Sequence, residues 1–182
     1  VNFIKLLQFP PTPGSNGQKA KTQKEGNALD KAEFSRRVLA CQNRLYRVAI
    51  AILRADADAQ DAAQEALLRA WKHLPSLQDA RYFETWLLRI LIRECQRALK
   101  RRGKRPLPAE SHWLENRAAP SDSGADLRDA LNQLELKYRL PVVLHYIEGY
   151  SYAQVAELLR LSESAAAWRT RQGVEKLRNL LL

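Results

Sequence analysis

The sequence predicts an all-α protein of two small helical domains joined by a flexible linker, the second containing a helix-turn-helix. Apolar residues recur at three- and four-residue steps along most of the 182 residues, as in amphipathic helices. No stretch shows the alternation of Val, Ile and Thr that is typical of a strand. A stretch rich in Pro, Gly and Ser divides the helical pattern, so we expect domains at 29–102 and 126–182 with a linker at 103–125.

The segment before the first domain has a different composition. Residues 1–28 contain Pro10, Pro11 and Pro13, three glycines and several lysines. Such a composition favours a flexible extension over packed structure. The segment also makes a poor signal peptide, because it has one early lysine and only a short apolar patch.

Three helices are expected in the first domain. The first follows Leu29 and buries a stripe of residues at helical spacing. Asp56 or Asp58 is expected to cap the second helix, which ends near Pro75. The third begins between Arg81 and Glu84 and ends at Gly103. The predicted inner faces are Phe34, Val38, Cys41 or Leu45, Val48 and Ile52 in the first helix, and Ala59, Ala63, Ala66, Ala70 and Leu74 in the second.

The second domain is expected to begin with one helix through Leu127 and Tyr138 that Pro141 interrupts, followed by helical residues 142–147. Ser151 and Gln154 have the spacing of a capping box and open the next helix. Ser162 can cap the last helix. The predicted buried residues of these two helices are Val155, Ala156, Leu158 and Leu159, then Ala166, Thr170, Val174, Leu177 and Leu181.

Composition narrows the kinds of partner. The formal net charge of +10 suits a polyanion, either nucleic acid or an acidic membrane surface, although a generic basic protein is an equal alternative. Cys41 and Cys95 stand alone and the three histidines are scattered, so we expect neither a zinc site nor any other metal or cofactor. Two free thiols fit a reducing compartment, and we expect a cytoplasmic protein.

Two short helices between Ser151 and Arg178, separated by only a few residues, have the spacing of a DNA-binding helix-turn-helix. Its second helix needs long polar or basic side chains on its outer face. The alternative is a helical hairpin whose arginines are merely solvated. The candidate groove and phosphate contacts are Ser162, Arg169, Arg171, Gln172 and Lys176.

The third helix combines aromatic residues at its start with basic residues along its length. Basic side chains hold phosphates and aromatic rings stack on unpaired bases, which together suit single-stranded DNA. The alternative is a solvated charged face, and Trp86 alone favours a core position. The candidate contacts are Tyr82, Phe83, Arg93, Arg97, Lys100 and Arg101.

The second helix carries an acidic face in this basic chain. Asp58, Asp61 and Glu65 fall on one stripe, with Gln64 beside it. These residues could dock a basic partner protein, whereas the helix dipole alone would also explain Asp58 and Asp61.

These segments resemble the extracytoplasmic-function group of bacterial sigma factors, in the same order, over about residues 29–182. DAQDAAQEALLRAWKHL resembles the region that binds the largest subunit of RNA polymerase. FETWLLRILIRECQRALKRR resembles the segment that reads and opens the proximal promoter element. LRDALNQLELKYRLPVVLHYIEGYSYAQVAELLRLSESAAAWRTRQGVEKLR resembles the domain that reads the distal element.

The resemblance implies a transcription initiation factor with roles for matching residues. The acidic face of the second helix would contact core RNA polymerase, with Trp71 supporting that helix from inside. Melted promoter DNA would meet Arg81, Tyr82, Phe83 and a basic face at Arg89, Arg93 and Arg97. The helix-turn-helix would meet double-stranded promoter DNA. A monomer that an anti-sigma factor, often at the membrane, holds inactive is also implied.

Several positions depart from the family pattern. Arg93 and Arg97 stand where Asn and often Asp are usual, and Arg160 replaces a turn glycine. In the last helix the usual small–Thr–Val–Lys–Ser–Arg run is replaced by Ser164, Ala165, Ala166, Ala167, Trp168 and Arg169. We therefore expect recognition of the distal element to be weak, altered in sequence or dependent on a partner.

Three alternative functions can be compared with the initiation factor. A helix-turn-helix regulator that acts without polymerase would leave the acidic face without a role. A degenerate sigma-like protein could work mainly through protein contacts. An enzyme is the weakest alternative, because no phosphate loop, metal cluster or nucleophile–base arrangement is evident and no small-molecule substrate is expected.

Overall fold

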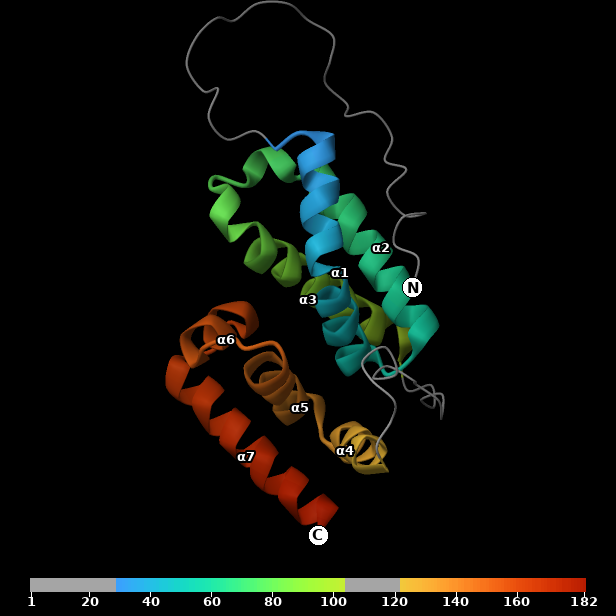
Figure 1. Cartoon of the computed structure of the whole chain (residues 1–182), viewed down its shortest axis with the longest axis vertical. Coiled ribbons are helices and arrows are strands. Elements are labelled where there is room, and N and C mark those ends of the chain that lie inside the picture. Colours follow the sequence, from blue (N-terminus) through green and yellow to red (C-terminus); the bar gives the residue numbers. More distant parts are fainter. Residues whose placement is uncertain (1–28, 104–121) are drawn as a thin grey trace, which may run out of the picture.

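The computed structural model describes residues 29–103 and 122–182, and every regular element in these ranges is a helix. Helices α1 to α3 form one bundle and helices α4 to α7 form a second, which lies beside it (Figure 1). The all-α prediction with two helical domains is confirmed. The predicted extension at 1–28 and most of the predicted linker lie outside the described residues, and α4 already begins at Asp122.

The first bundle consists of α1 (Lys31–Leu53), α2 (Asp56–Lys72) and α3 (Phe83–Arg102), with the short helices η2 (Leu74–Ser76) and η3 (Ala80–Tyr82) between α2 and α3. Its core includes Phe34 on α1 and Leu87 on α3, both with no exposed surface. The four predicted alanines of α2 are buried as expected, whereas Leu74 is only partly buried because it lies beyond α2 in η2. Small side chains on α2 let the neighbouring helices approach closely.

The expected cap of α2 is wrong. The residue before the helix is Ala55, which offers no side-chain cap, and Asp56 is already the first helical residue. The reason is the sharp turn after α1, where Arg54 adopts a left-handed conformation with a φ of 57° and only Ala55 remains extended. Both Asp56 and Asp58 still lie in the first turn, where the helix dipole favours negative charge.

The second bundle consists of α4 (Asp122–Gln133), α5 (Leu136–Val142), the π-helical turn η4 (Val143–Ile147), α6 (Tyr152–Leu159) and α7 (Glu163–Leu181). The single helix expected through Tyr138 is wrong, because one helix ends at Gln133 and the next begins at Leu136. Pro141 does not interrupt its helix either. Proline keeps a helical φ, although it removes one amide donor and crowds the carbonyl four residues earlier, and α5 continues through Pro141 into the wider turn of η4.

The caps of the last two helices are confirmed. The amide of Gln154 donates to Ser151 Oγ at 3.2 Å, and the amide of Ser151 donates to Gln154 Oε1 at 2.9 Å. The amide of Ala165 donates to Ser162 Oγ at 3.2 Å. Most of the predicted inner residues of both helices are buried. Leu159 and Val174 are only partly buried. Leu181 is 46% exposed because the bundle no longer covers the end of α7.

Arg139 on α5 joins the two bundles from within. Its side chain is buried, and its Nε donates to the carbonyl of Ala51 on α1 at 2.6 Å. Its Nη1 donates to the carbonyl of Leu134 at 2.9 Å, an oxygen that also accepts from Arg54 Nη2 at 2.8 Å. Burial, with the charge of Arg54 nearby, lowers the pKa of Arg139 to about 9. Backbone carbonyls near helix ends thus satisfy the guanidinium where the two bundles meet.

Candidate nucleic-acid and polymerase interfaces

The acidic face of α2 is exposed along most of its length. Asp61, Gln64 and Glu65 all face solvent. Asp58 is only partly exposed, and its carboxylate accepts from Arg102 Nη1 of α3 at 2.9 Å. On the opposite side of α2, Trp71 packs edge-on against Phe34 with ring centroids 5.2 Å apart. The face available to a partner is therefore narrower than predicted and consists of Asp61, Gln64 and Glu65.

The aromatic start of α3 divides into one exposed and two packed residues. Tyr82 is 63% exposed, whereas Phe83 is 3% exposed and its ring lies 5.5 Å from that of Phe34. The expected contact of Phe83 with DNA is therefore wrong, because its ring belongs to the core. Trp86 is half-buried against Phe83.

Arg81 is exposed beside these rings. Its side-chain nitrogens donate to Asp79 at 2.7 and 2.9 Å, which lowers the pKa of the Asp79 carboxyl. The pair is open to water, so a phosphate could take the place of the carboxylate at small energetic cost.

A pocket of ≈ 660 Å³ lies between these rings and the second bundle. Tyr82 and Trp86 give it aromatic walls, and Arg89 gives it a cation. Residues 76–79 carry no motif and were not predicted as part of this site, because they reach the pocket only through the turns between α2 and α3. The lining residues are Ser76, Leu77, Gln78, Asp79, Tyr82, Thr85, Trp86, Arg89 and Glu157.

The basic residues of α3 differ in their availability. Arg93, Lys100 and Arg101 are exposed. Arg97 is exposed as well, but it forms an ion pair with the buried carboxylate of Glu94. That carboxylate also pairs with Arg69, whose Nε lies 2.9 Å from Glu94 Oε1. Desolvation and three neighbouring arginines, first among them Arg160, lower the pKa of Arg93. This clustering of like charge indicates a surface suited to an anion.

The helix-turn-helix is formed by α6 and α7, and the turn contains Arg160 with a φ of 56°. Arg171 and Lys176 are exposed on α7, whereas Arg169 and Gln172 are half-buried. Gln172 Nε2 donates to Glu175 Oε2 at 3.2 Å. Ser162 is exposed, but its hydroxyl already caps α7 and lies 3.1 Å from Ser164 Oγ.

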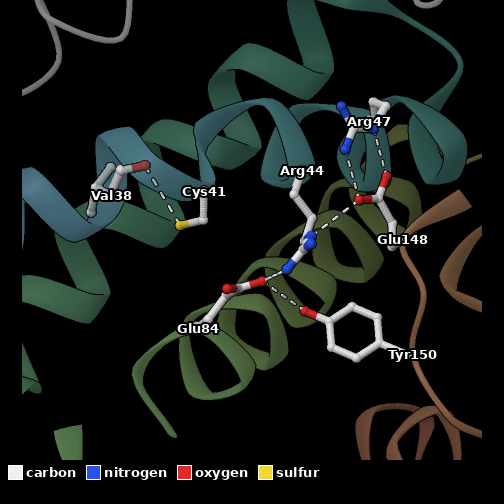
Figure 2. A network of polar contacts seen from close by, with 7 residues as sticks. All are labelled: Val38, Cys41, Arg44, Arg47, Glu84, Glu148 and Tyr150. Carbon is white, nitrogen blue, oxygen red and sulfur yellow. Dashed lines mark hydrogen bonds and ion pairs between the residues drawn. The ribbon is translucent and has the colours of Figure 1, made fainter. Parts of the chain in front are cut away.

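A polar network joins the two bundles (Figure 2). Glu148 is the first residue after η4, and its side chain has no exposed surface. It accepts from Arg47 Nε at 2.6 Å, Arg47 Nη2 at 2.8 Å and Arg44 Nε at 3.2 Å. Arg44 also pairs with Glu84 on α3, whose carboxylate accepts from the Tyr150 hydroxyl at 3.0 Å. Residues about a hundred positions apart in the chain therefore hold the bundles together.

The same arrangement places the helix-turn-helix against the pocket. Glu157 on α6 lines the pocket and pairs with Arg89 on α3. Glu157 of the second bundle is thus paired with the arginine that is predicted to meet proximal promoter DNA.

Comparison with known proteins gives two family matches. Residues 38–105 match the family described as Sigma-70 region 2, and residues 125–177 match Sigma-70, region 4. The chain is 34% identical over 138 residues to RNA polymerase sigma factor CarQ of Myxococcus xanthus, covering 71% of this chain and 78% of CarQ. The ECF RNA polymerase sigma factor SigW of Bacillus subtilis is 31% identical over 157 residues, covering 77% of this chain and 84% of SigW. The chain belongs to the extracytoplasmic-function RNA polymerase sigma factors.

Two further comparisons concern length and fold. The chain is 34% identical over 161 residues to the probable RNA polymerase sigma factor RfaY of Xanthomonas campestris pv. campestris. The match covers 82% of this chain but only 40% of the length of RfaY. The sigma factor RpoE of Bartonella quintana, solved in complex with the anti-sigma factor NepR, shares the fold with a TM-score of 0.73 at 23% identity. That likeness covers 82% of this chain and 96% of RpoE.

The described residues offer neither a membrane span nor a metal site. Among the helices described, none is long and apolar enough to cross a bilayer. Within 29–103 and 122–182, no three His, Cys, Asp or Glu side chains are grouped so that they could hold a metal ion. The free thiols of Cys41 and Cys95 are buried.

Proposed function

We propose that this chain binds core RNA polymerase and directs it to particular promoters, which it recognises and helps to open. One observation carries the proposal. The acidic face of α2 and the basic, aromatic surface of α3 lie on one bundle, and the helix-turn-helix lies on the other, so the chain has a separate surface for each step. Membership of the sigma factor family supports the same assignment. The role is non-catalytic, because the polymerase performs the chemistry.

Polymerase binding is assigned to Asp61, Gln64 and Glu65 on α2. Their exposure leaves both carboxylates free to pair with basic side chains of a partner. Asp58 contributes indirectly, since its ion pair with Arg102 joins the start of α2 to the end of α3.

Melted DNA of the proximal element is assigned to the pocket and to the basic face of α3. An unpaired base can stack against Tyr82 and Trp86, while Arg81 and Arg89 bind the flanking phosphates. Arg93, Lys100 and Arg101 extend the cationic surface along α3. Phe83 acts from the core by supporting Trp86.

Double-stranded DNA of the distal element is assigned to α7. A recognition helix reads base edges with exposed side chains near its N-terminal half, and Arg171 is exposed there. Arg169, Gln172 and Lys176 lie beside it, and amide groups at the start of α7, which Ser162 caps, favour a phosphate.

An anti-sigma factor is a further proposed partner. The structurally similar RpoE was solved with such a protein. A partner of this kind would cover the polymerase-binding and DNA-binding surfaces of a chain that is otherwise monomeric.

Run-off transcription tests the proposed function. The full chain is added to core RNA polymerase on genomic DNA fragments, and discrete new transcripts are expected. The double variant Asp61→Asn/Glu65→Gln should lose these transcripts and keep its binding to promoter duplex. A regulator that acts without polymerase would instead bind duplex DNA, show no affinity for core polymerase and give no new transcripts.

A further inference from the structure

Trp168 is a large apolar side chain on the exposed face of α7. It is 52% exposed, whereas Ala166 and Thr170 on the inner face have no exposed surface. Ser164 and Arg171 lie one turn before and one turn after it on the same side of the helix, and both are exposed. Trp168 therefore lies on the side of α7 that would face the groove.

Contacts with α5 hold the indole in place. The ring of Tyr138, which is 9% exposed, lies 6.2 Å from the ring of Trp168 at an angle of 58°. The ammonium groups of Lys137 and Lys176 lie 4.8 and 5.4 Å from the centre of the Tyr138 ring. A fixed aromatic surface flanked by two cations suits a partner that carries an apolar group close to phosphates.

The chemistry of the major groove narrows the choice of partner. Base edges there present hydrogen-bonding groups, and the C5-methyl group of thymine is the apolar group among them. An indole offers an apolar face and a single N–H donor, so it gains most from a methyl group that it removes from water. We propose that Trp168 reads a thymine methyl group in the duplex element that α7 binds. The inference rests on the proposed function, because it requires α7 to enter the groove.

The experiment compares sequence preferences and then removes a single methyl group. The full chain, assembled with core RNA polymerase, selects duplexes from a library randomised over the distal element, and the Trp168→Ala variant does the same. The wild-type selection is expected to require thymine at one or two positions that the variant leaves open. Deoxyuridine, which lacks only the C5-methyl group, then replaces each such thymine. The wild type should lose about fourfold in affinity, the effect of burying one methyl-sized group, and the variant should lose nothing.

Tyr146→Ala provides the matched control. Tyr146 is an exposed aromatic of the same bundle, 60% exposed, but it lies on η4, away from α7. This variant should keep the wild-type preference and the full uracil effect. Trp168→Ala also removes the ring contact with Tyr138, so circular dichroism and thermal unfolding check that both variants fold and keep their stability.

The outcomes separate the two proposals. Loss of affinity on uracil substitution that is equal in the wild type and in Trp168→Ala would overturn the role of Trp168 while leaving the sigma factor assignment intact. A wild-type selection without any required thymine would overturn that role as well. So would a Trp168→Ala variant that binds core polymerase more weakly but selects the same duplexes as the wild type. Failure of the assembled wild type to bind any duplex would overturn the proposed function itself.

Discussion

Buried charges at single residues connect the two bundles, and Glu148 is the clearest case. Its carboxylate is fully buried and accepts from two arginines of α1. Glu148→Gln keeps the size of the side chain but removes the charge that both guanidinium groups face. We expect the free energy of unfolding to fall by about 1–3 kcal/mol, at the low end for a buried pair because both arginines are partly exposed to water. Urea unfolding measures the change, and a loss below that of an ordinary surface substitution would contradict it.

The two cysteines give a second prediction at this scale. Burial raises the pKa of the Cys41 thiol to about 11 and that of Cys95 to about 12. The thiolate is the reactive form, so at pH 8 only about one Cys41 in a thousand is ionised, and Cys95 still fewer. Alkylation of the folded chain, followed by mass spectrometry, should therefore be slow, and raising the pH toward 10 should accelerate it. Rapid modification of either thiol at pH 8 would show that its helix opens readily.

Residue types predicted the surfaces better than the individual contacts. Asp61, Glu65, Arg93 and Arg171 are exposed where the sequence pattern placed them. Phe83 and Tyr82 are adjacent aromatics, and the pattern gave no basis for assigning one to the core and the other to solvent. The orientation of α3 against Phe34 separates them, and that depends on packing between helices distant in the sequence.

At the scale of elements, α5 and α7 pack unusually closely at Gly173. A Cβ added there would lie 2.5 Å from Val142 Cγ2 and 3.1 Å from the carbonyl oxygen of Tyr138. Gly173→Ala should therefore lower the free energy of unfolding by about 1–3 kcal/mol, although alanine favours helix more than glycine does. Thermal unfolding checks this against Glu175→Ala, an exposed substitution on the same helix that should change little. A Gly173→Ala variant as stable as the wild type would contradict the close contact.

Helix periodicity predicted α1, α2, α3, α6 and α7 because each buries one continuous stripe. Periodicity failed between α4 and α5, where Leu131, Leu134 and Tyr138 keep helical spacing although one helix ends and another begins between them. Apolar spacing reports which residues are buried and does not show whether the backbone between them is continuous. Pro141 was misread for a related reason, since proline removes one hydrogen bond without requiring the helix to end.

At the scale of the whole molecule, contact between the bundles covers part of the proposed DNA surface. Glu157 lines the pocket and pairs with Arg89, so its carboxylate competes with any phosphate there. Glu157→Gln should raise the affinity of the full chain for single-stranded DNA by up to about fivefold, the limit for a largely exposed ion pair. Fluorescence anisotropy with a labelled oligonucleotide measures this, with Asp129→Asn, an exposed position on α4, as control. Equal affinities in all three proteins would show that Glu157 does not obstruct the surface.

The relative placement of the bundles could not be predicted from the sequence. Its contacts pair residues such as Arg47 with Glu148 and Arg139 with Ala51, which lie about ninety to a hundred positions apart. Composition and periodicity act over one or two helical turns and carry no information about such pairs. The sequence therefore predicted two domains with their surfaces, whereas the covering of one surface by the other required the structure.

The most direct test of the central claim is the affinity of the full chain for core RNA polymerase. A fluorescently labelled wild type is titrated with core polymerase beside Asp61→Lys/Glu65→Lys, and Asp126→Lys/Asp129→Lys is the control. Asp126 and Asp129 are exposed on α4, so the control makes the same change in net charge away from α2. Tight wild-type binding that the α2 variant loses and the α4 variant keeps is the predicted result. A folded wild type with no affinity for core polymerase would contradict the claim.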